Sequence, residues 1–167
     1  MAPGPTDLLT LDQQLCFALS VADRRVVGIY RPLLEPLGLT HPQYLVMIAL
    51  WQHAPVPMRE LGHLLVLDSG TLSPLLARLE TAGLVLREKG PDRRTIIVDL
   101  TGQGRELRQR AASVPNGVLQ HLGLKIEELT ALHTKLLALI SAAQPGAQPT
   151  RRREPTGTSG TAGGTRD

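Results

Sequence analysis

The sequence has 167 residues, of which 42% are hydrophobic and only 2% aromatic, so we expect one leucine-rich, mainly helical domain with extensions. No apolar run approaches the roughly 20 residues of a transmembrane helix, and the first residues do not resemble a signal peptide, which predicts a cytoplasmic protein without membrane contact. The net charge is +3, but residues 144–167 contribute +2 of it, so charge alone does not identify a nucleic-acid-binding protein.

A long helix is predicted over residues 7–35, because apolar side chains recur there at steps of three and four. This apolar face consists of Leu8, Leu11, Leu15, Leu19, Ala22, Val26, Ile29 and Leu33. Thr10 and Gln13 have the spacing of a capping box near its start. Pro36 and Gly38 are expected to end the helix.

Three further helices are predicted before the pattern changes. The segment 40–43 has the form of a second capping box, and the near-continuous apolar run 44–51 after it indicates a buried helix. Two shorter helices are predicted over 57–65 and 69–82, with a tight break at 66–68 between them.

The period then changes from helical to alternating, which predicts two strands at 84–88 and 95–100 joined by the basic turn 89–94. After the second strand a helix is predicted to run to about Pro115, and another to cover 126–143.

Three segments follow from this assignment. Residues 1–6 are expected to form a flexible N-terminus and 7–143 the domain. Residues 144–167 are mostly Pro, Gly, Thr, Ala and Arg without periodicity, so a disordered tail is expected there.

Two short helices followed by a hairpin describe a winged helix-turn-helix, a mainly α fold with a small β-hairpin wing. The first turn of the second helix is expected to face the bases and phosphates of a major groove. Arg93 and Arg94 suit a narrow minor groove, where the negative potential is enhanced, and Asp92 is expected to orient Arg94 through a charge-assisted hydrogen bond. The candidate DNA-binding residues are Asp68, Ser69, Gly70, Thr71, Ser73, Pro74, Arg78, Asp92, Arg93 and Arg94.

The same pattern also fits an ordinary helical hairpin at 57–83 and a solvated turn at 89–94. Residues 59–94 hold six basic and five acidic side chains, so no broad basic surface is expected. Affinity for double-stranded operator DNA would then depend on a few placed contacts and on dimerisation.

The helix-turn-helix and hairpin region resembles the MarR family of transcriptional regulators. The resemblance is carried by Leu67-Asp-Ser-Gly-Thr-Leu-Ser-Pro-Leu-Leu-Ala-Arg-Leu-Glu80, Gly83-Leu-Val85, Asp92-Arg-Arg94 and Leu100-Thr101. Three N-terminal segments are similar to the organic hydroperoxide resistance repressors of that family, in their one-cysteine type. They are Gln13-Gln-Leu-Cys-Phe-Ala-Leu19, Tyr30-Arg-Pro-Leu-Leu34 and Thr40-His-Pro-Gln-Tyr44. The resemblance covers about residues 8–140 and implies a homodimer whose interface is built by the first and last helices.

Cys16 lies near the start of the first predicted helix, at the margin of its apolar face. The positive end of a helix dipole favours a thiolate, and a thiolate attacks a peroxide to give sulfenic acid. The alternative is an inert buried thiol, because free cysteine is among the most buried residue types. The resemblance implies the reactive role, with tyrosines of the partner subunit hydrogen-bonded to Cys16.

Tyr30 matches one of those tyrosines, whereas His41 stands at the second matching position and Ser20 at a third. A neutral His41 can still donate a hydrogen bond, and a protonated one would favour the thiolate further. The alternative for His41 is a solvated residue in the first turn of its helix. The redox-sensing candidates are therefore Cys16, Tyr30 and His41.

Cys16 is the only cysteine of the sequence, which therefore offers neither a resolving thiol nor a thiolate metal cluster. A sulfenic acid at Cys16 would form a mixed disulfide with a low-molecular-weight thiol, cyclise with a backbone nitrogen, or overoxidise. The mixed disulfide is the expected switch. The five histidines are scattered, so no metal site or other cofactor is expected.

The leading hypothesis is a repressor that senses organic hydroperoxides at Cys16 and then releases its operator to derepress a peroxide-detoxification gene. The alternative is a MarR-type repressor released by a small phenolic or acidic ligand, held between the dimer helices and the winged domain. A thiol peroxidase is disfavoured because no catalytic constellation accompanies Cys16, so the chain is not expected to be an enzyme.

Overall fold

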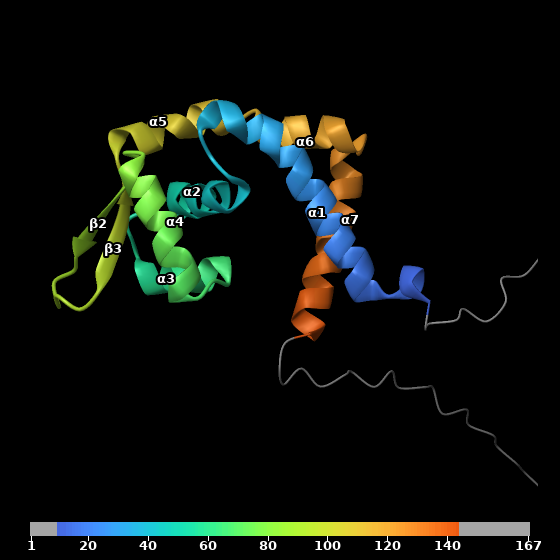
Figure 1. The fold of residues 1–167 in the computed structure, drawn as a ribbon, viewed down its shortest axis with the longest axis horizontal. Coiled ribbons are helices and arrows are strands. Elements are labelled where there is room, and N and C mark those ends of the chain that lie inside the picture. Colours follow the sequence, from blue (N-terminus) through green and yellow to red (C-terminus); the bar gives the residue numbers. More distant parts are fainter. Residues whose placement is uncertain (1–9, 144–167) are drawn as a thin grey trace, which may run out of the picture. The chain divides into compact units, whose positions relative to one another are not determined.

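The computed structural model describes residues 10–143, so the expected flexible N-terminus at 1–6 and the expected tail at 144–167 lie outside the described residues (Figure 1). The chain divides into two compact units, residues 1–123 and 124–167, and each is described by itself.

The first helix starts later than its periodicity predicts. Thr10 precedes a short 3-10 turn, η1 (Leu11–Gln13), and α1 (Leu15–Leu34) begins only at Leu15. Gln14 has an extended backbone, with ψ at 115°, and this residue separates η1 from α1. The proposed capping box at Thr10 therefore does not open the long helix. A second 3-10 turn, η2 (Glu35–Leu37), follows α1.

Helix α2 (His41–His53) is the centre of the first unit. Its capping box is confirmed, because the Thr40 backbone N–H donates to Gln43 Oε1 at 2.9 Å. The predicted burial is confirmed as well, since one set of its side chains is almost free of solvent: Tyr44, Val46, Met47, Ala49 and Leu50. Helix α2 contacts α1, α3, α4, α5 and the last strand, so it joins the helix-turn-helix to the rest of the unit.

Helices α3 (Met58–Leu65) and α4 (Ser69–Thr81) form the predicted helix-turn-helix. Their inner faces are fully buried at Leu61, Leu72, Leu76 and Leu79. The turn between them is tight, and Val66 adopts a left-handed backbone with φ at +54° while remaining 90% exposed. A left-handed conformation is uncommon for a β-branched residue. We infer that the packing of α3 against α4 stabilises this backbone conformation.

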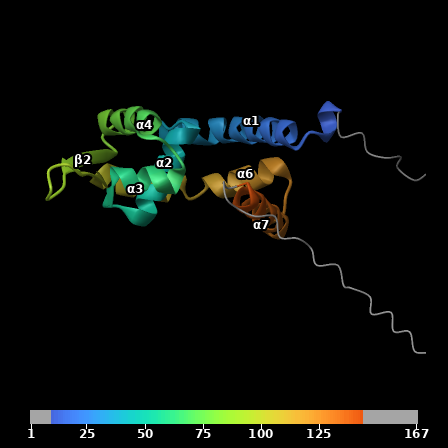
Figure 2. The same ribbon diagram turned by 90° about the horizontal axis from the view of Figure 1, so that it is seen from below.

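The wing is a three-stranded antiparallel sheet in the order β1-β3-β2, with β1 at Val56–Pro57, β2 at Val85–Lys89 and β3 at Ile96–Leu100. The short strand β1, which pairs Val56 with Val98, was not predicted, because two residues show no alternation. The alternating pattern of this strand places Ile96, Val98 and Leu100 on one face, and the structure buries only part of that face. Val98 and Leu100 are buried, but Ile96 is 41% exposed. Figure 2 shows β2 beside α3 and α4 at the end of the unit away from the start of α1.

The prediction of one helix running to Pro115 is wrong. Helix α5 (Gly102–Ala111) ends earlier, and Pro115 lies in the first turn of a separate helix, α6 (Val114–Leu122). Proline is tolerated in a first turn because the N–H groups there have no intrahelical acceptor. Helix α6 packs on α1.

The second unit contains α7 (Ile126–Ala142), in agreement with the predicted range. It has no buried residue, although several large apolar side chains lie on it. Ile126, Leu132, Leu137 and Ile140 are each about half exposed. None of the helices within residues 10–143 combines the length and the hydropathy of a transmembrane span.

Gly104 of α5 provides a test of how closely this helix packs against Leu84 and Trp51. A Cβ added there would clash with the Leu84 carbonyl oxygen, and the Gly104 carbonyl already accepts from Trp51 Nε1 at 2.8 Å. We expect Gly104→Ala to lower the free energy of unfolding by about 3 kcal/mol, the upper end of overpacking costs. The matched variant Gly102→Ala on the same helix meets nothing within 4 Å and should stay within about 1 kcal/mol of wild type. Urea unfolding curves measure both, and equal stabilities of the two variants would contradict the packing described.

Candidate nucleic-acid interface and thiol site

The first turn of α4 is fixed by Asp68. Its Oδ1 accepts from the Thr71 backbone N–H at 2.8 Å, and its Oδ2 accepts from Thr71 Oγ1 at 3.1 Å. These hydrogen bonds lower the pKa of Asp68, the backbone bond contributing most. Asp68 is thus the N-cap of α4. This structural role was not predicted, since the sequence indicated only a DNA contact for Asp68.

The remaining candidates of α4 occupy its outer surface. Ser69, Gly70, Thr71, Pro74 and Arg78 are exposed, whereas Ser73 is half-buried. Because Pro74 has no N–H, it cannot donate to the carbonyl of Gly70 four residues earlier. The exposed start of α4 therefore presents small side chains and main-chain polar groups, which can approach a nucleic acid closely.

The turn of the wing is organised by Asp92. Asp92 Oδ1 accepts from the backbone N–H groups of Arg94 at 3.1 Å and Thr95 at 2.8 Å, and Thr95 Oγ1 donates to Oδ2 at 2.6 Å. The bonds from Thr95 are the main cause of the lowered pKa of Asp92. The hydrogen bond predicted between Asp92 and Arg94 is therefore donated by the main chain of Arg94, and it stabilises the turn.

Arg93 and Arg94 are exposed at this turn, and Arg93 has a left-handed backbone with φ at +57°. Two ion pairs occur within residues 10–143, Arg87 with Glu80 and Arg105 with Asp99, and neither includes Arg93 or Arg94. Both cations of the wing turn are available to an outside anion.

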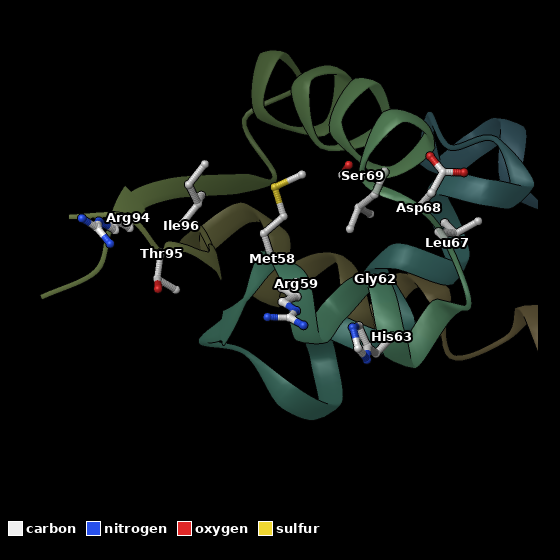
Figure 3. A pocket seen from close by; sticks show the side chains of 11 residues that line it. Met58, Arg59, Gly62, His63, Leu67, Asp68, Ser69, Arg94, Thr95 and Ile96 are labelled. Atoms are coloured by element: carbon white, nitrogen blue, oxygen red, sulfur yellow. The ribbon is translucent and has the colours of Figure 1, made fainter. Parts of the chain in front are cut away.

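A groove of about 460 Å³ lies between α3, the start of α4 and the wing (Figure 3). Asp68, Ser69 and Arg94, which were predicted from the sequence as DNA-binding residues, line this groove, and so do Arg59 and His63, which were not predicted. Both are exposed side chains of α3. The signal in the sequence that could have indicated them is that they are polar positions on a helix whose other face is apolar. Only the folded chain places them opposite the wing.

Cys16 is exposed and is the second residue of α1. Large apolar side chains around it are exposed as well, namely Leu11, Leu15, Phe17 and Leu19. The hydroxyl of Ser20 donates to the Cys16 carbonyl oxygen at 2.8 Å, so Ser20 is bonded to the main chain of Cys16. The Cys16 side chain is thus not buried in the described chain, unlike in the alternative considered above.

Tyr30 and His41 lie together, with ring centroids 4.8 Å apart. Both are half-buried, which differs from the solvated His41 considered as an alternative. Cys16 and Tyr30 belong to one continuous helix, 14 residues apart, which places them about 21 Å apart along its axis. Within one subunit the thiol therefore cannot touch this aromatic pair.

The pKa of His41 is lowered, chiefly by burial, and Asp23 opposes that shift through its charge. The lowered pKa favours the neutral imidazole of His41. Burial also raises the pKa of Tyr44, whose ring lies 6.0 Å from that of Tyr30, and the charge of Tyr30 contributes. The aromatic cluster thus offers neutral hydrogen-bonding groups.

A second pocket, of about 730 Å³, lies between the C-terminal half of α1 and the start of α2. Arg24, Arg31 and His41 line it together with one carboxylate, Glu35. Gly28 also lines it, and a Cβ added there would meet nothing within 4 Å. Glycine inside a helix lowers stability by about 1 kcal/mol relative to alanine. Because a larger side chain would fit at position 28, packing within this chain does not explain why a glycine stands there. No group of three His, Cys, Asp or Glu side chains in residues 10–143 could hold a metal ion.

Comparisons with known proteins agree with this geometry. The MarR family profile matches residues 39–96. The organic hydroperoxide resistance transcriptional regulator of Bacillus subtilis (strain 168) is 37% identical over 135 residues, which are 80% of this chain and 92% of that protein. The HTH-type transcriptional regulator TtmR of Methylorubrum extorquens (strain PA1) is 41% identical over 137 residues, 81% of this chain and 70% of that protein.

A solved structure extends the comparison to three dimensions. Overoxidized AbfR bound to DNA, a Staphylococcus epidermidis protein, aligns with a TM-score of 0.63 and 31% sequence identity. The alignment covers 78% of this chain and 93% of AbfR. The winged helix-turn-helix fold is therefore confirmed.

The capping role of Asp68 predicts a pH dependence. A lowered pKa in the folded state means that the Asp68 carboxylate stabilises the fold above its ordinary pKa, and that this contribution is lost as the pH falls through the lowered value. We expect wild type to be more stable than Asp68→Ala above about pH 5 and the difference to shrink below about pH 4. Urea unfolding across this range measures it. Asp68→Asn, which keeps a capping oxygen but does not titrate, should lie between them, and a pH-independent difference would contradict the assignment.

Proposed function

The chain belongs to the MarR family of transcriptional regulators, and we propose that it is a homodimeric repressor that releases operator DNA when an organic hydroperoxide oxidises Cys16. The observation that carries the proposal is the exposed thiol at the start of α1, in a chain similar to an organic hydroperoxide resistance regulator. The relatives named above are transcriptional regulators, which favours regulation over catalysis.

DNA binding is assigned to the exposed start of α4 and to the wing. In this proposal α4 enters a major groove with Ser69, Gly70, Thr71, Ser73 and Pro74 toward the duplex, and Asp68 and Asp92 hold the two contact segments in shape. Arg78 contacts a phosphate, and Arg93 and Arg94 enter the minor groove, where an arginine is attracted by the negative potential.

Dimerisation is supported by exposed apolar side chains on α1 and on α7, each considered within its own unit. The N-terminal part of α1 exposes Leu11, Leu15 and Leu19, and α7 has no buried residue. Exposed apolar surface of this kind marks an interaction site. A second copy is also what would bring the Tyr30–His41 pair to a Cys16 thiol, since one subunit keeps them far apart. The functional domain is then 7–143, in a cytoplasmic protein.

The proposed redox step is balanced as follows. The Cys16 thiolate attacks a peroxide oxygen, an S–O bond forms and the O–O bond breaks, so that sulfur is oxidised to sulfenic acid and the hydroperoxide is reduced to an alcohol, with solvent supplying the proton. A low-molecular-weight thiol then displaces water from the sulfenic acid to give a mixed disulfide. The bulky adduct favours the subunit arrangement that does not fit DNA.

Cys16→Ser tests the proposal. We expect the reduced wild type and Cys16→Ser to bind operator DNA equally. Cumene hydroperoxide with a small thiol should weaken wild-type binding by about tenfold or more and leave Cys16→Ser unchanged, because the serine hydroxyl is not oxidised. Electrophoretic mobility shifts with intact mass measure release and adduct together.

Ser20→Ala is the matched control, because Ser20 contacts only the main-chain carbonyl of Cys16 among the hydrogen bonds described. It should respond like wild type. Peroxide-driven release in Cys16→Ser would refute the thiol as sensor.

The second pocket favours another candidate function, release by a small organic acid. Two arginines and one carboxylate line it, together with apolar side chains of Val27, Leu39 and Pro42. Such a mixture suits an anion with an apolar body.

Gly28→Leu tests this second candidate. The leucine would occupy the open space of the pocket, so salicylate should release operator DNA from Cys16→Ser without peroxide but not from the double variant with Gly28→Leu. Gly102→Leu, at an open position outside the pocket, serves as the control. If salicylate has no effect on Cys16→Ser, or if Gly28→Leu leaves its effect intact, the pocket is not a ligand switch.

A further inference from the structure

We propose that the groove between α3, the start of α4 and the wing binds one phosphodiester of the operator strand that separates the major from the minor groove, with Arg59 as its cation. The proposal rests on the proposed DNA-binding function and adds to it a site on α3, an element to which no DNA contact has been assigned above.

The position of the groove follows from the two contact segments. When a recognition helix lies in the major groove and a wing in the neighbouring minor groove, one sugar-phosphate strand must run between them. The groove is bounded by Ser69 at the start of α4 on one side and by Arg94 and Thr95 of the wing on the other. Figure 3 shows Arg59 and His63 on α3, with Arg59 between these two boundaries and His63 nearer the start of α4.

The charges in the groove suit a phosphodiester. Arg59 is exposed and belongs to neither ion pair found in residues 10–143. Asp68 is the one carboxylate in the lining, and both of its oxygens accept hydrogen bonds from Thr71. A guanidinium forms two parallel hydrogen bonds with phosphate oxygens, so Arg59 can hold the strand in one orientation.

The apolar part of the lining explains a departure from the expected strand pattern. Ile96 is 41% exposed although it begins an inward-facing series on β3, and it lines this groove with Met58. Apolar side chains beside a cation match a deoxyribose next to a phosphate better than a free anion. Ile96 therefore has a role at the surface that the protein core does not require.

The test compares Arg59→Ala with Arg108→Ala in the full-length protein. Arg108 is an exposed arginine of α5 that does not line the groove. Binding to a fluorescent operator duplex and to an unrelated duplex is measured at several salt concentrations. For Arg59→Ala we expect the slope of log K against log salt to fall in magnitude by about 0.9 for each of the two contacts in a dimer. Both duplexes should lose affinity by the same factor, and Arg108→Ala should behave like wild type.

Two results would overturn the proposal. An unchanged slope in an Arg59→Ala protein that melts at the wild-type temperature means that Arg59 meets no phosphate. A loss confined to the operator duplex means that Arg59 reads bases. Failure of the wild type to prefer any operator over unrelated DNA would instead refute the proposed function, so the two failures are distinguishable.

Discussion

The burial of α2 is the interaction on which both candidate sites depend. Met47 and Leu50 are almost completely removed from solvent, and the helix contacts α1, α3, α4, α5 and β3. Its first turn carries His41 against Tyr30, while its other contacts hold the helix-turn-helix and the wing. Helix α2 therefore positions the Tyr30–His41 pair through its first turn and the nucleic-acid interface through its contacts with α3, α4 and β3. A shift of α2 would move both.

The helix-turn-helix was predictable because local signals agreed there. Apolar periodicity and the switch to an alternating pattern indicated the boundaries of α4, β2 and β3 within one or two residues. The signals failed where one residue allows two outcomes. Pro115 can follow a helix or sit in the first turn of the next one, and the structure has the second arrangement. Strand β1 is too short to show a period, and it exists because Val56 pairs with Val98 far along the chain.

The candidate sites could be proposed from the sequence only residue by residue. Cys16 and the wing arginines were identified from sequence, but the groove that joins Arg59 to Arg94 depends on segments 35 residues apart, so no local pattern describes it. Asp92 illustrates the same limit at short range. Its partner was predicted, but only the folded turn shows that the main chain of Arg94 is what it bonds.

The unbroken length of α1 has a consequence for how the protein would respond to its own concentration. Because Cys16 is exposed in a single chain, a peroxide can reach the thiol of a monomer. The aromatic pair lies about 21 Å along the helix, so in the proposed mechanism it is a second subunit that brings the pair to the thiol. Oxidation of the thiol would then not depend on protein concentration, whereas the regulatory response would, because dimerisation follows mass action. A cell holding few copies would oxidise the monomer without regulatory effect, and coupling would appear only once the subunits have associated.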